Sequence, residues 1–198
     1  PNLSAYRSDL IKKGAQYPLN NVPAPQPGLL NILPPPPPHC TSWPWTKETD
    51  PAIYHKSTNW PKLTIVTPSY NQDKFLEETI RSVLLQNYPN LEYIIIDGGS
   101  TDGTGEIINK YKDRIALYIS EPDKGPADAI NKGFRQSTGD IMCWLNSDDK
   151  MHSNSFFAVA EIFSAFNDVD WIMGYPTWYN AEGACLGELF VSKSNFFY

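Results

Sequence analysis

The sequence predicts an α/β domain with a mostly parallel central sheet, covered by helices on both faces and preceded by a proline-rich extended arm. Two observations predict the domain. Short apolar runs alternate with helical segments four times after Pro61, and the run LEYIIID (Leu91–Asp97) is apolar almost throughout. Such alternation favours parallel pairing, and a continuously apolar strand is typical of a sheet covered on both faces. The arm is predicted because thirteen of the 18 prolines lie at or before Pro61.

Residues 1–61 form the predicted arm or linker, and residues 62–198 form the predicted domain. Five consecutive prolines occupy Pro34–Pro38. Because proline lacks the backbone N–H and fixes φ, we expect an extended polyproline II segment here. Two tryptophans in SWPWTKE (Ser42–Glu48) predict that part of the arm docks on the domain. A ligand for a proline-reading module is the alternative use of this segment.

The strands of the domain are read from short apolar runs between turn residues. A buried strand is predicted to begin at Lys62 and to be halted by Pro68. The other predicted strands, in chain order, cover residues 91–97, 115–120, 140–145 and 170–175. The sequence AEG (Ala181–Gly183) predicts the turn of a hairpin near the end of the chain.

The helices are read from apolar positions that recur three and four residues apart. One helical face is predicted to carry Leu76, Ile80, Val83 and Leu84, and a second helix carries Ile107, Ile108 and Tyr111. A third helix follows, with Pro126 in its first turn and Gly139 past its end. In the fourth, over residues 153–167, the side chains expected to face inward are Phe156, Ala160, Ile162 and Phe163.

Charge and cysteine content narrow the classes of function. A formal net charge of -6 argues against a nucleic acid partner. The three cysteines lie far apart without a CxxC pair, which argues against a disulfide framework or a zinc site and indicates a reducing compartment. No apolar run approaches a transmembrane length of about 18 residues, and no signal peptide is visible. We expect a cytoplasmic domain that is truncated at its C-terminus.

Four polar clusters follow the first four predicted strands. They are TPSYN (Thr67–Asn71), DGGSTDGT (Asp97–Thr104), EPDKGPADAINKG (Glu121–Gly133) and NSDD (Asn146–Asp149). Since the carboxyl ends of parallel strands meet at one edge of a sheet, we expect these clusters to form a ligand site there.

The cluster DGGSTDGT is not a dinucleotide-binding loop, because Ser100 stands where the GxGxxG pattern needs its second glycine. It also lacks the lysine of a phosphate-binding loop. We interpret Asp97 as an acceptor for a base N–H or a ribose hydroxyl. The alternative is that Asp97 only caps or satisfies the turn.

The cluster NSDD ends an apolar strand with two adjacent carboxylates, Asp148 and Asp149. Carboxylate oxygens suit Mg²⁺ or Mn²⁺, and such ions commonly take further oxygens from substrate phosphates. The cluster therefore predicts a divalent cation bound together with a diphosphate. A solvated turn, with one aspartate capping the next helix, is the alternative.

The cluster after the third strand mixes both charges. Lys124 and Lys132 could face phosphates, or could pair with Asp123 and Asp128. Gly125 and Pro126 place a helix N-terminus at the same edge, where an anion is favoured.

Four segments in this order, VTPSYN, IIIDGGSTDGT, SEPDKGPADAINKGF and TGDIMCWLNSDD, resemble the family 2 glycosyltransferases, in particular their bacterial branch. The resemblance runs from about Lys62 to Tyr175. It implies the GT-A fold, a Rossmann-like sandwich that binds a nucleoside-diphosphate sugar. It further implies transfer of the sugar, with inversion, to a glycan or lipid-linked acceptor in cell-surface polysaccharide biosynthesis. The cytoplasmic location allows a peripheral association with the inner membrane.

The resemblance also implies roles for individual residues. The nucleotide-sugar pocket would be formed by Pro68, Tyr70, Asn71, Asp97, Ser100, Asp128, Lys132, Asn146 and Ser147. The NSDD segment matches the family's DxD element, with Asn146 in place of the first aspartate. Asp148 is therefore the first expected metal ligand and Asp149 the second, for Mn²⁺ or Mg²⁺.

The catalytic base is not identified by the sequence. The family places it after the DxD element, where Glu182 and Glu188 are the only carboxylates beyond Asp170. Glu182 is expected in a solvated turn, so we expect the general base beyond Tyr198. His152 follows the acidic loop and is a further, weaker candidate for the metal.

Three other functions compete with a glycosyltransferase. A sugar nucleotidyltransferase would need a basic glycine-rich loop after its first strand, which TPSYNQDK (Thr67–Lys74) lacks. A non-catalytic sugar-nucleotide-binding or scaffolding domain would fit the missing base. A structural protein that binds partners through its proline arm would leave the acidic strand ends unexplained.

Overall fold

The computed structural model describes residues 28–57, 59–174, 176–179 and 185–188. Four parallel strands form the central sheet in the order β3-β2-β1-β4. They are β1 (Leu63–Ser69), β2 (Leu91–Asp97), β3 (Leu117–Ser120) and β4 (Ile141–Trp144). The predicted α/β class with a parallel sheet is therefore confirmed, and β1 and β2 are its central strands.

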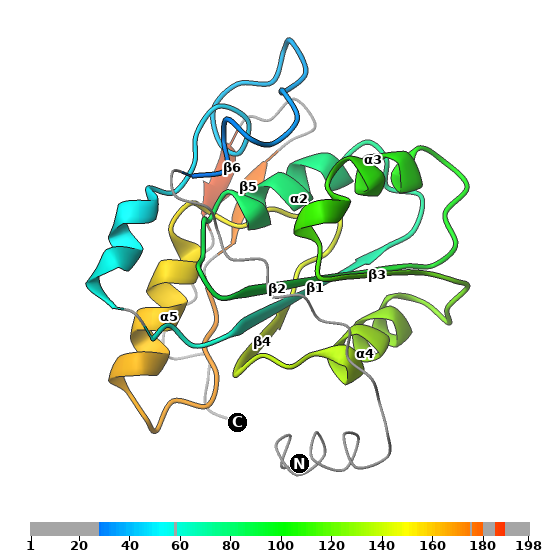
Figure 1. The fold of residues 1–198 in the computed structure, drawn as a ribbon. Helices are drawn as coiled ribbons and strands as arrows, with labels where there is room; N and C mark the ends of the chain where they lie inside the picture. The colour runs from blue at the N-terminus through cyan, green and yellow to red at the C-terminus, as the bar shows by residue number, and fades with distance from the viewer. Residues whose placement is uncertain (1–27, 58, 175, 180–184, 189–198) are drawn as a thin grey trace.

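Helices cover both faces of this sheet, as Figure 1 shows. They are α2 (Leu76–Leu84), α3 (Thr104–Lys110), α4 (Pro126–Gln136) and α5 (Ser155–Ala165), with short 3₁₀ turns at η1 (Pro51–Lys56) and η2 (Lys112–Arg114). Helices α2 and α3 lie on one face and α4 lies on the other. Pro126 opens α4 as predicted, because the first turn of a helix does not need its N–H.

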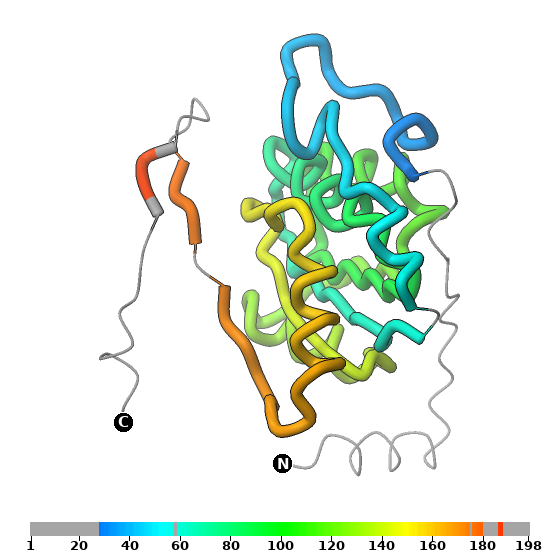
Figure 2. Tube along the Cα trace, turned by 90° about the vertical axis from the view of Figure 1, so that its left-hand side faces the viewer, coloured from blue at the N-terminus to red at the C-terminus, as the bar shows by residue number. Residues whose placement is uncertain are grey.

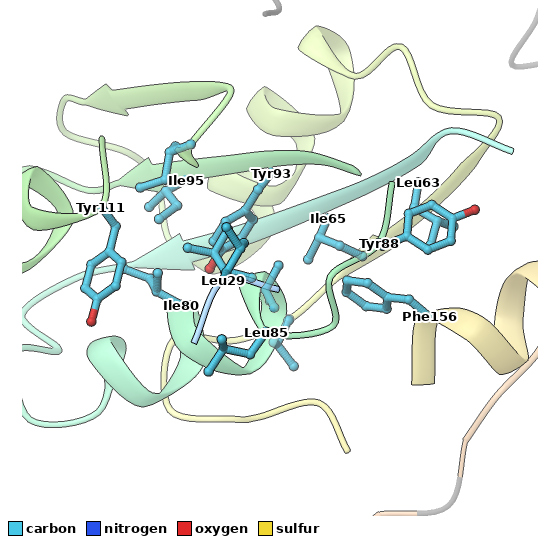
Figure 3. Close-up of a cluster of buried hydrophobic side chains, with 14 of the residues drawn as sticks. Leu29, Leu63, Ile65, Ile80, Leu85, Tyr88, Tyr93, Ile95, Tyr111 and Phe156 are labelled. Carbon is cyan, nitrogen blue, oxygen red and sulfur yellow. The ribbon is translucent and has the colours of Figure 1, made fainter. Parts of the chain in front are cut away.

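The alternation of side chains along the strands divides the core between these two faces. Leu63 and Ile65 of β1 pack with α2 in the larger cluster, and Val66 packs with α4 in the smaller one. Figure 3 shows the larger cluster, where Ile80 of α2 and Leu29 of the arm meet side chains of β1 and β2. The apolar face predicted for α2 is buried throughout.

Strand β1 continues through Pro68 to Ser69, so the prediction that Pro68 halts it is wrong. The carbonyl of Val66 accepts a hydrogen bond from Leu145 on the β4 side, and Pro68, two residues later, faces the same side. Pairing with β4 ends at Val66 and Trp144. The N–H that Pro68 lacks would therefore point beyond the end of β4, so no hydrogen bond of the sheet is lost.

A closed polar network ties the amino ends of the strands together. Glu92 of β2 is buried, and Lys62 lies 2.6 Å from its carboxylate. The same carboxylate accepts hydrogen bonds from the hydroxyl groups of Thr64 (2.6 Å) and Thr138 (2.5 Å) and from the Thr138 N–H (2.7 Å). Burial alone would raise the pKa of Glu92, but these hydrogen bonds outweigh it and hold the pKa below its usual value.

The described part of the proline-rich arm docks on α2, as the tryptophans predicted. Arg81 of α2 is fully buried, and its guanidinium donates to three carbonyl oxygens of the arm, those of Pro34 (2.8 Å), Pro44 (3.2 Å) and Trp45 (3.1 Å). The guanidinium also lies 5.2 Å from the centre of the Trp45 ring. The division at Pro61 stays a prediction, although Leu29 of the arm belongs to the main core.

The end of the described chain differs from the sequence prediction. Residues 170–174 are irregular, so the predicted fifth strand is wrong for them. Trp171 (68% exposed) and Met173 (57% exposed) are not covered by any sheet, so their hydrophobicity does not indicate a buried strand. The next strand, β5 (Thr177–Tyr179), pairs antiparallel with β6 (Cys185–Glu188), and this hairpin lies to one side of the body (Figure 2). Its turn, Ala181–Gly183, lies outside the described residues.

Two further expectations can be compared with the structure. In α5, Phe156 and Ala160 are buried as predicted, whereas Ile162 and Phe163 are only half-buried. Within the described ranges, every helix is too short or too polar to cross a bilayer.

Candidate functional site

The carboxyl ends of the strands meet at one edge of the sheet. The chain passes from β1 to β2 and β3 on one side, then returns to place β4 on the other side of β1. This reversal makes a topological switch point between the ends of β1 and β4, and parallel α/β sheets bind ligands at such points. Tyr70 and Asn71 follow β1 at this edge, and Asn146 to Asp149 follow β4.

Asp97 organises the loop after β2. Its side chain is buried (1% exposed), and its carboxylate accepts hydrogen bonds from the Ser100 N–H (2.9 Å), the Ser100 hydroxyl and the Ser120 hydroxyl (2.6 Å). These hydrogen bonds support the alternative interpretation, in which Asp97 caps the turn that follows β2. A carboxylate can accept about four hydrogen bonds, so Asp97 retains capacity for one further donor.

The loops after β1 and β2 are joined side by side. The hydroxyl of Ser100 accepts a hydrogen bond from the Asn71 N–H (2.8 Å), and the Asn71 side chain accepts one from the Thr101 N–H (2.9 Å). Asn71 has a φ of 51°, a left-handed conformation that asparagine tolerates better than most residues. Asn71, predicted from the first polar cluster, therefore forms one hydrogen-bonded unit with Asp97 and Ser100, predicted from the second.

An exposed aromatic ring borders this unit. Tyr70 is 60% exposed, although it directly follows a buried strand. A Cβ atom placed on Gly98 would lie 3.2 Å from the Tyr70 ring and 2.9 Å from the Asp123 carboxylate. The absence of a side chain at Gly98 therefore allows Tyr70 and Asp123 to approach the end of β2 closely.

The charged residues of the segment after β3 pair with one another. The ammonium group of Lys132 lies 2.9 Å from the Glu121 carboxylate and 3.8 Å from that of Asp128. The hydrogen bond with Glu121 is the main cause of a raised pKa at Lys132. Asp128 also accepts a hydrogen bond from the Lys124 N–H (3.1 Å). Of the two alternatives that the sequence left open for Lys132, the structure shows the pairing one.

The acidic loop, defined as residues 146–152, exposes its carboxylates. Asn146, Asp148 and Asp149 are exposed, and Ser147 is buried. The side-chain amide of Asn146 donates a hydrogen bond to Asp149 (3.1 Å). Asp148 has no hydrogen-bond or ion-pair partner among the residues that the structure describes, so its carboxylate is available to a ligand.

Helix α2 fixes the backbone of the acidic loop. The buried hydroxyl of Thr79 lies 2.9 Å from the Ser147 carbonyl oxygen and 2.7 Å from that of Asp149, within donating distance of both. Lys150 pairs with Glu78 on the same helix (2.7 Å). The chain on each side of Asp148 is therefore anchored while its side chain stays free.

The donor set of this loop fits a hard divalent cation that is completed by a ligand. Asp148 and Asp149 offer carboxylate oxygens, and Asn146 offers an amide oxygen. In the described part of the chain, no three His, Cys, Asp or Glu side chains gather closely enough to hold a metal by themselves. That substrate phosphates supply the remaining oxygens stays a prediction.

The sequence also offered His152 as a weaker candidate for the metal, and Glu182 and Glu188 as the carboxylates beyond Asp170. His152 is the last residue of the acidic loop, but its Nε2 atom lies 3.0 Å from the Thr177 hydroxyl of β5. Glu182 lies outside the described residues, and Glu188 is described only by its place at the end of β6.

Sequence reasoning did not single out Ser69. Its hydroxyl is buried and has no hydrogen-bond partner in the described part of the chain, and Ser69 is the register partner of Asp97. A polar residue at the last position of a buried strand was the signal that could have identified it.

Fold and site together define a class of protein: an α/β protein with an exposed acidic loop and a hydrogen-bonded set of polar groups at the switch point of its sheet. The family model described as "Glycosyl transferase family 2" matches residues 64–180. Since this match covers more than half of the 198 residues, the chain belongs to glycosyl transferase family 2. Membership and the parallel sheet with helices on both faces confirm the predicted GT-A class.

Curated relatives are glycosyltransferases by name. TuaG of Bacillus subtilis, whose name assigns it to teichuronic acid biosynthesis, is 42% identical over 97 residues, 47% of this chain and 38% of TuaG. An uncharacterized glycosyltransferase of Haemophilus influenzae is 43% identical over 94 residues, 46% of this chain and 38% of that protein. The chain therefore spans about two fifths of the length of these relatives.

Solved structures show a partial likeness. S. aureus TarS 1-349 in complex with UDP-GlcNAc has a TM-score of 0.49 and 26% identity, over 52% of this chain and 31% of the TarS 1-349 chain. The mannosyltransferase PcManGT of Pyrobaculum calidifontis, in complex with GDP-Man and Mn²⁺, has a TM-score of 0.48 and 22% identity, over 81% of this chain and 39% of PcManGT.

Proposed function

We propose that this chain is the donor-binding part of a glycosyltransferase that moves a sugar, of hexose type, from a nucleoside-diphosphate sugar to a glycan or lipid-linked acceptor. The observation that carries this proposal is that the Asn71–Asp97–Ser100 unit and the acidic loop share the switch-point edge of a family 2 chain. Inversion at the anomeric carbon and a divalent cation, Mn²⁺ or Mg²⁺, belong to the proposal.

The nucleoside would bind at the ends of β1 and β2. Pro68 lies one residue before the end of β1, and the exposed ring of Tyr70 offers a flat face for a base. Asp97 has one acceptor site left for a base N–H or a ribose hydroxyl. Asn71 and Ser100 hold the two loops in place around it.

The diphosphate would lie between α4 and the acidic loop. Asp128 and Lys132 lie in the first turns of α4, where the helix N-terminus favours an anion. Lys132 must exchange part of its pairing with Glu121 for a phosphate oxygen, which is a modest change for an exposed ion pair.

The cation would be held by Asp148 and Asp149, with Asn146 and Ser147 shaping the loop. When bound, a divalent cation supplies Lewis-acid stabilisation of the charge that develops on the departing diphosphate. Asn146 orients Asp149 through the hydrogen bond between their side chains, and Thr79 fixes the backbone on either side of Asp148.

The base that activates the acceptor hydroxyl stays a prediction for a segment beyond Tyr198, and the acceptor would approach from that part of the protein. The name of TuaG supports a role in cell-surface polysaccharide synthesis for this chain as well. A cytoplasmic location, with peripheral attachment to the inner membrane, stays part of the proposal.

Calorimetric titration with UDP, GDP, CDP, ADP and dTDP, each with Mn²⁺ and with EDTA, tests the proposal. We expect one nucleotide to bind, and its binding to depend on Mn²⁺. Asp148→Asn should remove the Mn²⁺-dependent part of the affinity. Asp113→Asn is the matched control, because Asp113 is an exposed carboxylate in η2, which precedes β3 at the opposite edge of the sheet.

Two results would contradict the proposal. Binding of no nucleotide would favour the non-catalytic scaffolding alternative. Equal Mn²⁺-dependent affinity in Asp148→Asn and the wild type would show that the acidic loop is not the metal site.

A further inference from the structure

The acidic loop is held by helix α2 from one side. Thr79 contacts the carbonyl oxygens of the loop at two positions, Ser82 accepts a hydrogen bond from the Met151 N–H (3.1 Å), and the Gln86 side chain donates to the His152 carbonyl (2.8 Å). Residues 79, 82 and 86 are three and four positions apart and therefore lie on one face of the helix and its extension. This face fixes the path of the loop but contacts only one side of it.

The proline-rich arm holds the same chain segment from a second side. The indole N–H of Trp43 donates to the Met151 carbonyl oxygen at 2.7 Å. Trp43 and Met151 also both pack against the main core, so this hydrogen bond is partly shielded from water. Two residues beyond the loop, the Asn154 N–H donates to the Thr49 hydroxyl (3.0 Å).

The arm can act as a rigid support because α2 holds it as well. The buried guanidinium of Arg81 contacts carbonyl oxygens on both sides of Trp43, at Pro34 and at Pro44. The Thr49 N–H donates to the Leu85 carbonyl oxygen at the end of α2 (2.8 Å). Helix α2 thus holds both the arm and the acidic loop by hydrogen bonds, and Trp43 of the arm contacts the loop directly.

We propose that arm residues 42–49 position the acidic loop for the cation and diphosphate, and that Trp43 is the positioning residue. This inference rests on the proposed function. Two exposed carboxylates repel each other, and a loop that is free to move would turn them apart in the absence of a cation. A backbone fixed on both sides of Asp148 keeps them ready for the cation, so less ordering is needed on binding.

The first experiment uses amide hydrogen exchange, without any ligand, to test whether the arm holds the acidic loop in place. Trp43→Phe keeps an aromatic ring at this position but removes the indole N–H together with part of the ring, a loss of volume that the control at Trp45 reproduces. Loss of one shielded hydrogen bond should raise amide hydrogen exchange at residues 146–154 about fivefold, with exchange in β1 and β2 unchanged. The matched control is Trp45→Phe, because Arg81 contacts the backbone carbonyl of Trp45 and the face of its ring. Thr49→Val, which removes the other arm contact, should act like Trp43→Phe.

The second experiment measures the consequence for binding. An equimolar mixture of the five nucleoside diphosphates is titrated into wild type and variants, with Mn²⁺ and with EDTA. Trp43→Phe should weaken the Mn²⁺-dependent affinity about tenfold, the usual cost of removing support behind a metal ligand. Affinity in EDTA should not change, whereas a general loss of stability would lower both affinities.

The outcomes separate this inference from the proposed function. If wild type binds none of the nucleotides, the proposed function fails, and the exchange experiment still decides whether the arm braces the loop. If Asp148→Asn removes Mn²⁺-dependent binding but Trp43→Phe changes neither exchange nor affinity, the proposed function stands and the positioning role is overturned.

Discussion

Strand β2 carries a buried carboxylate near each end, Glu92 at its second residue and Asp97 at its last, and each is 1% exposed. Glu92 has a cation beside it, Lys62, and hydroxyl donors around it. Among the described residues, the donors to Asp97 are those of Ser100 and Ser120. The carboxylate at the amino end of β2 thus has a full set of hydrogen-bond and ion-pair partners, whereas the carboxylate at its other end has an incomplete set.

The difference extends to the whole of each sheet edge. At the amino ends, the loop before β4 presses against β1, and the Gly139 N–H donates to the Thr64 hydroxyl. At the carboxyl ends, Asp148 and Asp149 are exposed, with Asp148 unpaired within the described chain. A closed edge contributes to stability, whereas an open edge retains binding capacity for a ligand. Substitutions at the closed edge should therefore change the free energy of unfolding, and substitutions at the open edge should change the affinity for a ligand.

The largest expected effect is that of Gly139→Ala at the closed edge. A Cβ atom there would lie 2.3 Å from the Thr64 hydroxyl oxygen and 2.8 Å from the Thr64 backbone nitrogen. Backbone of a central strand cannot move aside easily, so we expect a loss of about 3 kcal/mol in the free energy of unfolding. Urea denaturation measures this loss.

Gly98→Ala at the open edge is the matched control. Its nearest neighbours are side-chain atoms of Asp123 and Tyr70, at 2.9 and 3.2 Å, and a side chain can give way more easily than the backbone of a central strand. The free energy of unfolding should fall by less than about 1 kcal/mol. Equal losses for the two glycine substitutions would show that the edges do not differ in rigidity.

Glu92→Gln should cost about 2 kcal/mol, because the amide cannot accept hydrogen bonds at both ends and leaves Lys62 without its counter-charge. The exposed Glu106→Gln in α3 serves as the control, with an expected change below about 0.5 kcal/mol. Urea denaturation at neutral pH compares them. A Glu92→Gln protein as stable as wild type would show that the closed network contributes nothing net.

The same carboxylate makes stability depend on pH. Since the folded pKa of Glu92 lies below its ordinary value of 4.5, the unfolded chain binds more protons in that range. Its contribution is present above about pH 4.5 and is lost as the pH falls through the lowered folded pKa. The free energy of unfolding of wild type should therefore decrease on acidification more steeply than that of Glu92→Gln. Parallel curves would contradict this assignment.

The smallest effect on stability is expected for Asp148→Asn. Removing one of two adjacent exposed carboxylates relieves repulsion, so the free energy of unfolding should change by less than about 0.5 kcal/mol. Urea denaturation of the variant that has lost Mn²⁺-dependent nucleotide binding measures this directly. A large loss of stability would mean that the open edge is structural after all.

Local patterns predicted most of the fold because hydrophobic periodicity reports directly on burial. The buried face of α2 followed from this periodicity, and the start of α4 followed from the preference of proline for the first turn of a helix. The predictions at Pro68 and at residues 170–174 failed for one reason. Whether a residue belongs to a strand depends on which neighbour lies beside it, and a single chain segment does not contain that information.

The candidate site was predictable in part. Four polar clusters at strand ends indicated where to look, and family membership supports their use. The sequence did not reveal that Ser100 joins Asn71 to Asp97, nor that Lys132 is paired with Glu121. Those contacts bring together segments that lie far apart along the chain, or select one of several equally plausible partners.

By itself, the sequence determined the alternation of strands and helices, the proline-rich arm and the acidic residues that follow β4, because these depend on local composition and period. Only the tertiary structure decided that Arg81 would be buried under the arm and that Trp43 would reach Met151. A buried guanidinium needs acceptors that surround it from several directions, and only folding brings carbonyl groups of a distant segment to those positions.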